Sequence, residues 1–129
     1  MKYYIEKILD TDFESAVAKA KEALQSEGFG VLTEIDIHEK LKEKLGIEFR
    51  KYRILGACNP PLAHKALEKE DKIGTMLPCN VIVQELEKGK VEIAAVDPVA
   101  SMQAVENKEL AEIARDVRSR IEKVISMID

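Results

Sequence analysis

Apolar residues recur along the chain at two spacings, one typical of strands and one typical of helices. Alternating apolar positions predict five strands, at residues 2–9, 29–37, 49–55, 79–86 and 91–96. Apolar positions three and four residues apart predict four helices, which begin at Thr11, Asp36, Asn59 and Asn107. The last of these helices has the clearest amphipathic stripe, running from Leu110 to Ile128. The predicted order of elements is β-α-β-α-β-α-β-β-α.

Short polar motifs mark where the predicted helices start. Thr11 with Glu14, and Asp36 with Glu39, have the spacing of a capping box, in which each side chain bonds the backbone of the other. Asn59 precedes two prolines, an arrangement typical of an N-cap followed by the first turn of a helix. These motifs support the predicted helices independently of the apolar pattern.

The order of the elements also predicts the fold class. Helices and strands alternate early in the chain, and a strand–turn–strand hairpin follows late. This mixture favours an α+β fold of two layers, with the helices on one face of a mixed or antiparallel five-stranded sheet. A chain of 129 residues fits one domain, so residues 1–129 are expected to form a single domain.

Composition and charge narrow the classes of function. The net charge is −4, and basic residues are interleaved with acidic ones, so we expect no nucleic-acid partner. No apolar run approaches the roughly 20 residues that span a bilayer, so we expect no membrane association. The first residues lack the apolar stretch of a secretory signal. A cytoplasmic location is therefore expected.

The unusual chemistry of the sequence lies in two similar segments, residues 57–60 and 77–80, which we call the Cys-Asn segments. Each places a thiol beside a carboxamide and next to a proline: Cys58 with Asn59, and Cys79 with Asn80. Each also stands at a junction between predicted elements. These four residues are the candidate ligand-binding set.

The residues leave several uses of the two cysteines open. Cys58 and Cys79 could line a pocket for a small ligand, or form a reversible disulfide if their α-carbons come within about 7 Å. With His64 as a third ligand, they could bind a soft metal ion, although their spacing matches no standard zinc pattern. Buried cysteines that only pack remain the plainest alternative. No nucleotide-binding or serine-hydrolase motif is present, and catalytic residues stay unassigned.

Five stretches of the sequence resemble the domain of unknown function 302 family. They are residues 27–36, 44–46, 52–60, 77–81 and 97–98. The resemblance implies a compact α+β fold that commonly associates as a homodimer, and it implies no established activity. The high apolar content of a small chain with open sheet edges favours a homodimer as well.

Three functional hypotheses follow. The first is a homodimeric binding or sensory module with a small-molecule or metal ligand near the Cys-Asn segments. The second is a thiol-dependent redox enzyme or redox sensor that uses Cys58 and Cys79, and the third is a structural dimer module with buried cysteines. If the third and fourth strands are antiparallel neighbours, the two cysteines should lie close together at one end of the sheet.

Overall fold

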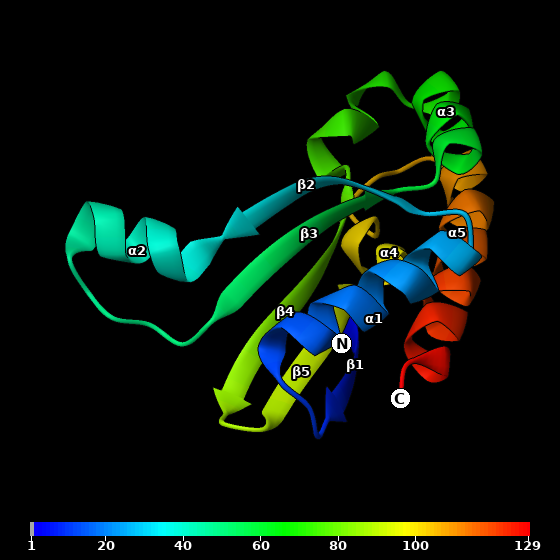
Figure 1. Ribbon diagram of the computed structural model, residues 1–129. Coiled ribbons are helices and arrows are strands. Elements are labelled where there is room, and N and C mark those ends of the chain that lie inside the picture. Colours follow the sequence, from blue (N-terminus) through cyan, green and yellow to red (C-terminus); the bar gives the residue numbers. More distant parts are fainter. Residues whose placement is uncertain (1) are drawn as a thin grey trace.

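The computed structural model, which describes residues 2–129, contains one antiparallel sheet of five strands (Figure 1). The strands lie in the order β1-β5-β4-β3-β2, and every neighbouring pair is antiparallel. Their bounds are Tyr4–Leu9 for β1, Gly30–Asp36 for β2, Tyr52–Cys58 for β3, Cys79–Glu87 for β4 and Lys90–Val96 for β5. The predicted α+β class is confirmed, and the sheet is antiparallel rather than mixed.

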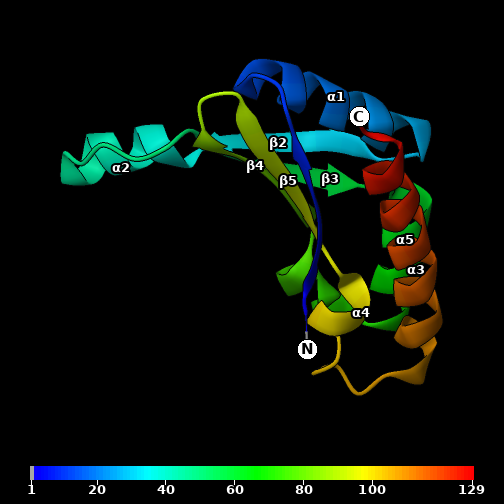
Figure 2. The ribbon, with the colours of Figure 1, turned by 90° about the horizontal axis from the view of Figure 1, so that it is seen from below.

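Three helices cover one face of this sheet: α1 (Phe13–Ser26), α3 (Pro60–Lys69) and α5 (Lys108–Met127). Figure 2 shows all three on the same side of the strands. A 3-10 helix η1 (Asp71–Met76) follows α3, and the short α4 (Pro98–Ser101) follows β5. Over the described part of the chain, the opposite face of the sheet is left uncovered. None of the described helices is long and apolar enough to cross a membrane.

The last helix packs as its stripe predicts. Its buried residues are Leu110, Ala114, Val117, Ile121, Val124 and Ile125, and Ile128 just beyond it is buried as well. Asn107 caps this helix by accepting a hydrogen bond from the backbone N–H of Glu109. The stripe meets α1 and the sheet in the main core, where side chains such as Phe13, Leu55 and Ile93 are almost fully enclosed. Burial of this apolar surface is the dominant stabilising term.

The helix α2 (Ile37–Leu45) departs from the layered arrangement. Figures 1 and 2 both show it projecting away from the sheet, and none of its residues is buried. A hydrogen bond from the backbone N–H of Tyr52 to His38 Nδ1 (3.0 Å) holds its first turn. Gly46, with a left-handed φ of 69°, ends the helix as the sequence predicts.

Both predicted capping boxes are wrong in detail. Asp12, rather than Thr11, caps α1, because its carboxylate accepts the backbone N–H of Ser15 at 2.8 Å. Asp36 stands at the N-cap position of α2 but makes no side-chain cap bond there. Its carboxylate instead accepts a hydrogen bond from Arg53 Nε at 2.7 Å, since an ion pair on the neighbouring strand competes for the same oxygens.

Most strand bounds differ from the predicted ones by one or two residues, and two differences affect the neighbouring elements. The second strand ends at Asp36, because Ile37 already begins α2. The third strand occupies Tyr52–Cys58 instead of residues 49–55, so Cys58 ends a strand rather than following one. This shift matters for the candidate site, because it places Cys58 within the pairing of β3.

Candidate functional site

The two Cys-Asn segments meet at one end of the sheet. In the pairing of β3 with β4, Ala57 lies opposite Cys79 and Gly56 lies opposite Asn80. Cys58 directly follows Ala57 and lies opposite Gly30 of β2, so it is one position beyond the residue that faces Cys79. The expectation that the end of the third strand meets the start of the fourth is therefore confirmed. Both cysteines are free thiols, each only partly exposed.

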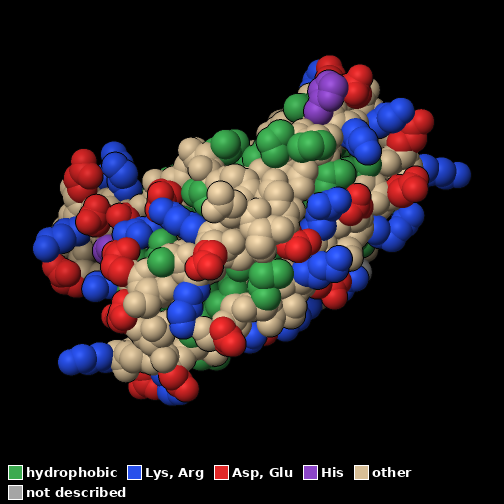
Figure 3. All heavy atoms as spheres, turned by 45° about the vertical axis from the view of Figure 1, so that its right-hand side comes forward, with side chains coloured by type: hydrophobic (Ala, Val, Ile, Leu, Met, Phe, Trp, Pro, Cys, Tyr) green, Lys and Arg blue, Asp and Glu red, His purple; other side chains and the backbone are tan. Residues whose placement is uncertain are grey.

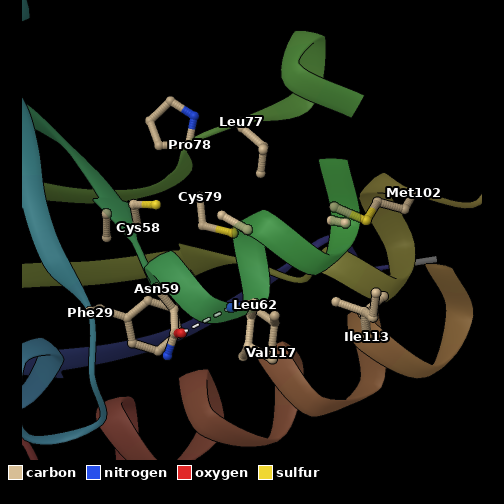
Figure 4. A pocket seen from close by; sticks show the side chains of 14 residues that line it. Phe29, Cys58, Asn59, Leu62, Leu77, Pro78, Cys79, Met102, Ile113 and Val117 are labelled. Atoms are coloured by element: carbon tan, nitrogen blue, oxygen red, sulfur yellow. Dashed lines mark hydrogen bonds between the residues drawn. The ribbon is translucent and has the colours of Figure 1, made fainter. Parts of the chain in front are cut away.

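A small cavity of about 30 Å³ lies at this end of the sheet, beneath α3 and α5. Both cysteines and Asn59 line it, and the rest of its lining is almost wholly apolar. In Figure 4 the side chains of Leu62 and Met102 approach it from α3 and from the segment after α4. An apolar cavity of this kind stays dry and favours apolar contents, because a water molecule needs two to four polar partners.

The cavity lies where two apolar clusters adjoin. Cys79 packs against the main core between the sheet and the helices. Leu77 and Met102 pack against a smaller cluster formed by Ala66, Ile73 and Leu110. Side chains of two separately packed groups meet here without filling the space between them. The position of the cavity thus follows from the way α3 and η1 extend the core beyond the sheet.

Cys79 is a buried and neutral thiol. Burial, with a smaller contribution from the neighbouring Cys58, raises its pKa to about 11. A thiol that is protonated at neutral pH is a poor nucleophile, because the thiolate is the reactive form. The geometry therefore favours a packing or ligand-contacting role for Cys79 over attack on a substrate.

The side chain of Asn59 is occupied by structural hydrogen bonds. Its Oδ1 accepts the backbone N–H of Leu62 at 3.3 Å, as the predicted N-cap of α3. Its Nδ2 donates to the backbone carbonyl of Glu27 at 3.5 Å and lies against Gly28. Asn59 thus forms part of the cavity wall and ties the start of α3 to the turn between α1 and β2.

The fourth predicted ligand residue does not join the other three. Asn80 is exposed, and it lies on the uncovered face of the sheet beside Ile82 and Tyr52. Successive side chains of a strand point to opposite faces, so Cys79 and Asn80 cannot both reach the cavity. The structure therefore brings Cys58, Asn59 and Cys79 together and leaves Asn80 apart.

His64 is not brought to the two cysteines either. Its side chain is 75% exposed, and its Nε2 lies 3.6 Å from the carboxylate of Glu68 one turn further along α3. Among residues 2–129, no group of three His, Cys, Asp or Glu side chains is arranged to hold a metal ion. The three residues predicted as soft-metal ligands, Cys58, His64 and Cys79, thus do not converge.

Sequence reasoning missed most of the cavity wall. Ile113, Ala114 and Val117 belong to the stripe of α5 and were expected only as core. Met102, which directly follows α4, was not among the candidate site residues. A methionine beside a short helix carries no signal of its own, whereas adjacent cysteines and asparagines do. The apolar residues of a site are thus harder to find from sequence than its polar ones.

Comparisons with known proteins agree with this fold. Among curated proteins, no sequence matches the chain. A crystal structure described as an uncharacterized conserved protein DUF302 from Bacillus stearothermophilus is similar, with 29% sequence identity, complete coverage of both chains and a TM-score of 0.91. The model of the family described as Domain of unknown function DUF302 matches residues 5–128. The chain therefore belongs to the DUF302 family.

Proposed function

We propose that the protein is a homodimeric binding module that holds a small, uncharged, apolar ligand in the cavity beside Cys58 and Cys79. The observation that carries the proposal is the cavity itself, which is lined almost wholly by apolar groups and by a neutral thiol. Such a lining stabilises an apolar ligand by contact and has few polar groups that could stabilise an ion. A sensory role would follow if occupancy changed the packing of α5.

Met102 is the side chain that would admit a ligand. The cavity of about 30 Å³ accommodates little more than a methyl group as it stands. A second hollow of about 520 Å³ lies outside it, between α4 and α5, and shares Met102 and Ala114 with it. Methionine is unbranched and adapts easily, so displacement of Met102 would join the two spaces. A ligand could then place an apolar end between α3 and α5.

The redox hypothesis has weaker support. Cys58 directly follows the residue that lies opposite Cys79, and it contributes to the raised pKa of that thiol, so the two side chains are near each other. However, the raised pKa of Cys79 disfavours the thiolate that would begin exchange. Redox activity and soft-metal binding therefore stay predictions, and the apolar ligand is the function that the geometry supports best.

A titration with benzene and with 1-hexanol, followed by amide NMR shifts, tests the proposal. We expect both probes to shift the amides of Leu62, Cys79 and Ala114, which surround the cavity. Met102→Ala should bind at least several-fold more tightly, because it enlarges the space. Ala114→Leu should abolish binding by filling it. Ala111→Leu is the matched control, since Ala111 lines only the outer hollow.

Two results would contradict the proposal. One is a failure of both probes to bind either the wild type or Met102→Ala. The other is equal binding by Ala114→Leu and by the wild type, which would place the probe elsewhere.

A further inference from the structure

The segment from α2 to the start of β3 forms an arm, residues 37–51, none of whose side chains is fully buried within its own chain. Its helix has nine residues, and isolated helices shorter than about 12–15 residues are marginal in water. Large apolar side chains on the arm nevertheless face solvent, with Leu45 at 66% and Ile47 at 44% exposure. Such an arm needs a surface outside its own chain to pack against.

The root of the arm is firmly held. Arg53 Nε donates to Asp36 at 2.7 Å, and its Nη1 donates to Glu14 at 3.0 Å, so one guanidinium joins β2, β3 and α1. Arg50, near the end of the arm that joins β3, donates to Gln84 at 2.8 Å and stacks on Phe49. The base of the arm is therefore fixed in the absence of a partner, which lowers the entropic cost of binding.

The uncovered face of the sheet is the second exposed apolar surface. Tyr4, Tyr52, Ile82 and Val96 line a hollow of about 430 Å³ on it, together with the polar Asn80, Gln84 and Glu92. Ile8 and Ile35, large side chains near its two edges, are also exposed. An antiparallel sheet can face water, but its outer face is then normally polar. This face instead mixes exposed large apolar side chains with polar ones, as the surface of a non-obligate interface does.

The chain exposes more surface than a compact monomer of its mass, and the excess matches the area that one partner would bury. A compact monomer of 14.5 kDa exposes about 6,900 Å². This chain exposes 7792 Å². The excess of about 900 Å² is close to the roughly 800 Å² that each partner buries in a stable interface of standard size.

Charge is divided between the arm and the rest of the chain. The arm carries five basic and three acidic residues, whereas the remainder of the sequence carries 15 basic and 21 acidic residues. On the uncovered face, acidic Glu6 and Glu92 lie on β1 and β5, at the edge far from the arm. Figure 3 shows no comparable separation on the helix side, where both signs are interspersed. A basic arm thus complements the acidic body of a second copy.

We propose that the arm and the uncovered sheet face together form a two-fold interface with a second copy of this chain. This inference depends on the homodimer in the proposed function, and it specifies which surface of each copy forms the dimer. Each arm lies over the β1–β5 side of the other copy, and the two sheet faces pack against each other. A two-fold interface must be self-complementary, and this surface carries both the projecting arm and the hollow that would receive it.

Sedimentation velocity on the full chain and two matched double variants tests the inference. Leu45→Glu with Ile47→Glu places charges on the arm, and we expect the dimer dissociation constant to rise at least about a hundredfold. Leu67→Glu with Met127→Glu places the same charges on exposed apolar positions of the helix side, and should leave the dimer unchanged. A wild-type monomer at micromolar concentration would overturn both this surface and the homodimer.

The other outcomes separate the surface from the homodimer. If the arm variant remains as dimeric as the control, the surface is wrong while the homodimer stands. Because a variant could lose the dimer simply by misfolding, hydrogen exchange on the wild type provides a second test. Amides of Ile37–Leu45 should be protected at high protein concentration and exchange quickly after dilution. Equally fast exchange at both concentrations would also overturn the surface, and benzene binding in the cavity would be unaffected.

Discussion

The side-chain amide of Asn59 lies against the α-carbon of Gly28, so that a Cβ added to Gly28 would lie 3.1 Å from Asn59 Nδ2. This approach joins the turn after α1 to the start of α3, two places that are far apart in sequence. It requires a residue without a side chain at a position where φ is already +84°. The wall of the cavity therefore depends on a glycine outside it.

Gly28→Ala should destabilise the protein by about 2 kcal/mol, because the left-handed backbone costs about 1–2 kcal/mol and the contact with Asn59 adds to it. Gly89→Ala has a similar φ of +85° but open space around it, and should show the backbone cost alone. Gly30→Ala has neither feature and should be nearly neutral. Urea unfolding of the three variants measures the differences, and equal losses at Gly28 and Gly89 would remove the role of the contact.

Asn59→Ala should lower the free energy of unfolding by about 1–2 kcal/mol, the usual range for loss of an N-cap. Asn59→Asp keeps the oxygen that accepts the N–H of Leu62 and loses only the donor to Glu27, so it should retain most of the stability. Thermal and urea unfolding measure both. A loss in Asn59→Asp as large as that in Asn59→Ala would mean that the amide donor to Glu27 is the more important bond.

Stability should fall at alkaline pH because of Cys79. Its pKa is raised to about 11 in the folded protein, against roughly 8.5 for an unfolded thiol. The folded state thus holds this proton more tightly, and the associated stability is complete below about pH 8.5 and is lost as the pH rises towards 11. Other groups also titrate there, so the measurement is the difference between the wild type and Cys79→Ala. The difference between their free energies of unfolding should shrink by about 2 kcal/mol between pH 8 and 11. Parallel curves of unfolding free energy against pH would contradict the prediction.

Arg53→Ala should cost about 1–3 kcal/mol, because the side chain is only 16% exposed and its loss leaves Asp36 unpaired between two strands. Arg53→Lys keeps the charge but cannot reach both carboxylates with a planar fork, so we expect it to recover little of the loss. Arg120→Ala removes a solvent-exposed pair with Asp116 and should change stability by less than about 0.5 kcal/mol. A neutral effect of Arg53→Ala would show that the arm is held mainly by other contacts.

The fold could be predicted from sequence where local pattern and tertiary packing agree. The stripe of α5 and the hairpin of β4 and β5 are such cases, because each buries the face that its periodicity marks as apolar. The arm is different: Leu41 and Leu45 have helical spacing, but periodicity identifies an apolar face without showing that its own chain covers it. The start of β3 was misplaced for a related reason, since Phe49 is a residue type common in strands but lies in the arm.

The candidate site could be found only in part. Adjacent cysteines and asparagines located the end of the sheet, and antiparallel pairing brought the cysteines together. The alternation of a strand then separated Asn80 from Cys79, a consequence that depends on register and not on residue type. Likewise, a shift of one or two residues around α3 decides whether a side chain such as His64 faces the cavity or the solvent.

The pairing of β1 with β5 bears on the order in which the chain assembles. Tyr4 lies opposite Val96, so the first of the described strands pairs with the last of them. Until β5 exists, β1 has no strand beside it and α1 has no α5 to pack against. Contacts that close so long a loop form slowly. We therefore expect the hairpin of β4 and β5 to form early in folding, and the two ends of the chain to join it last.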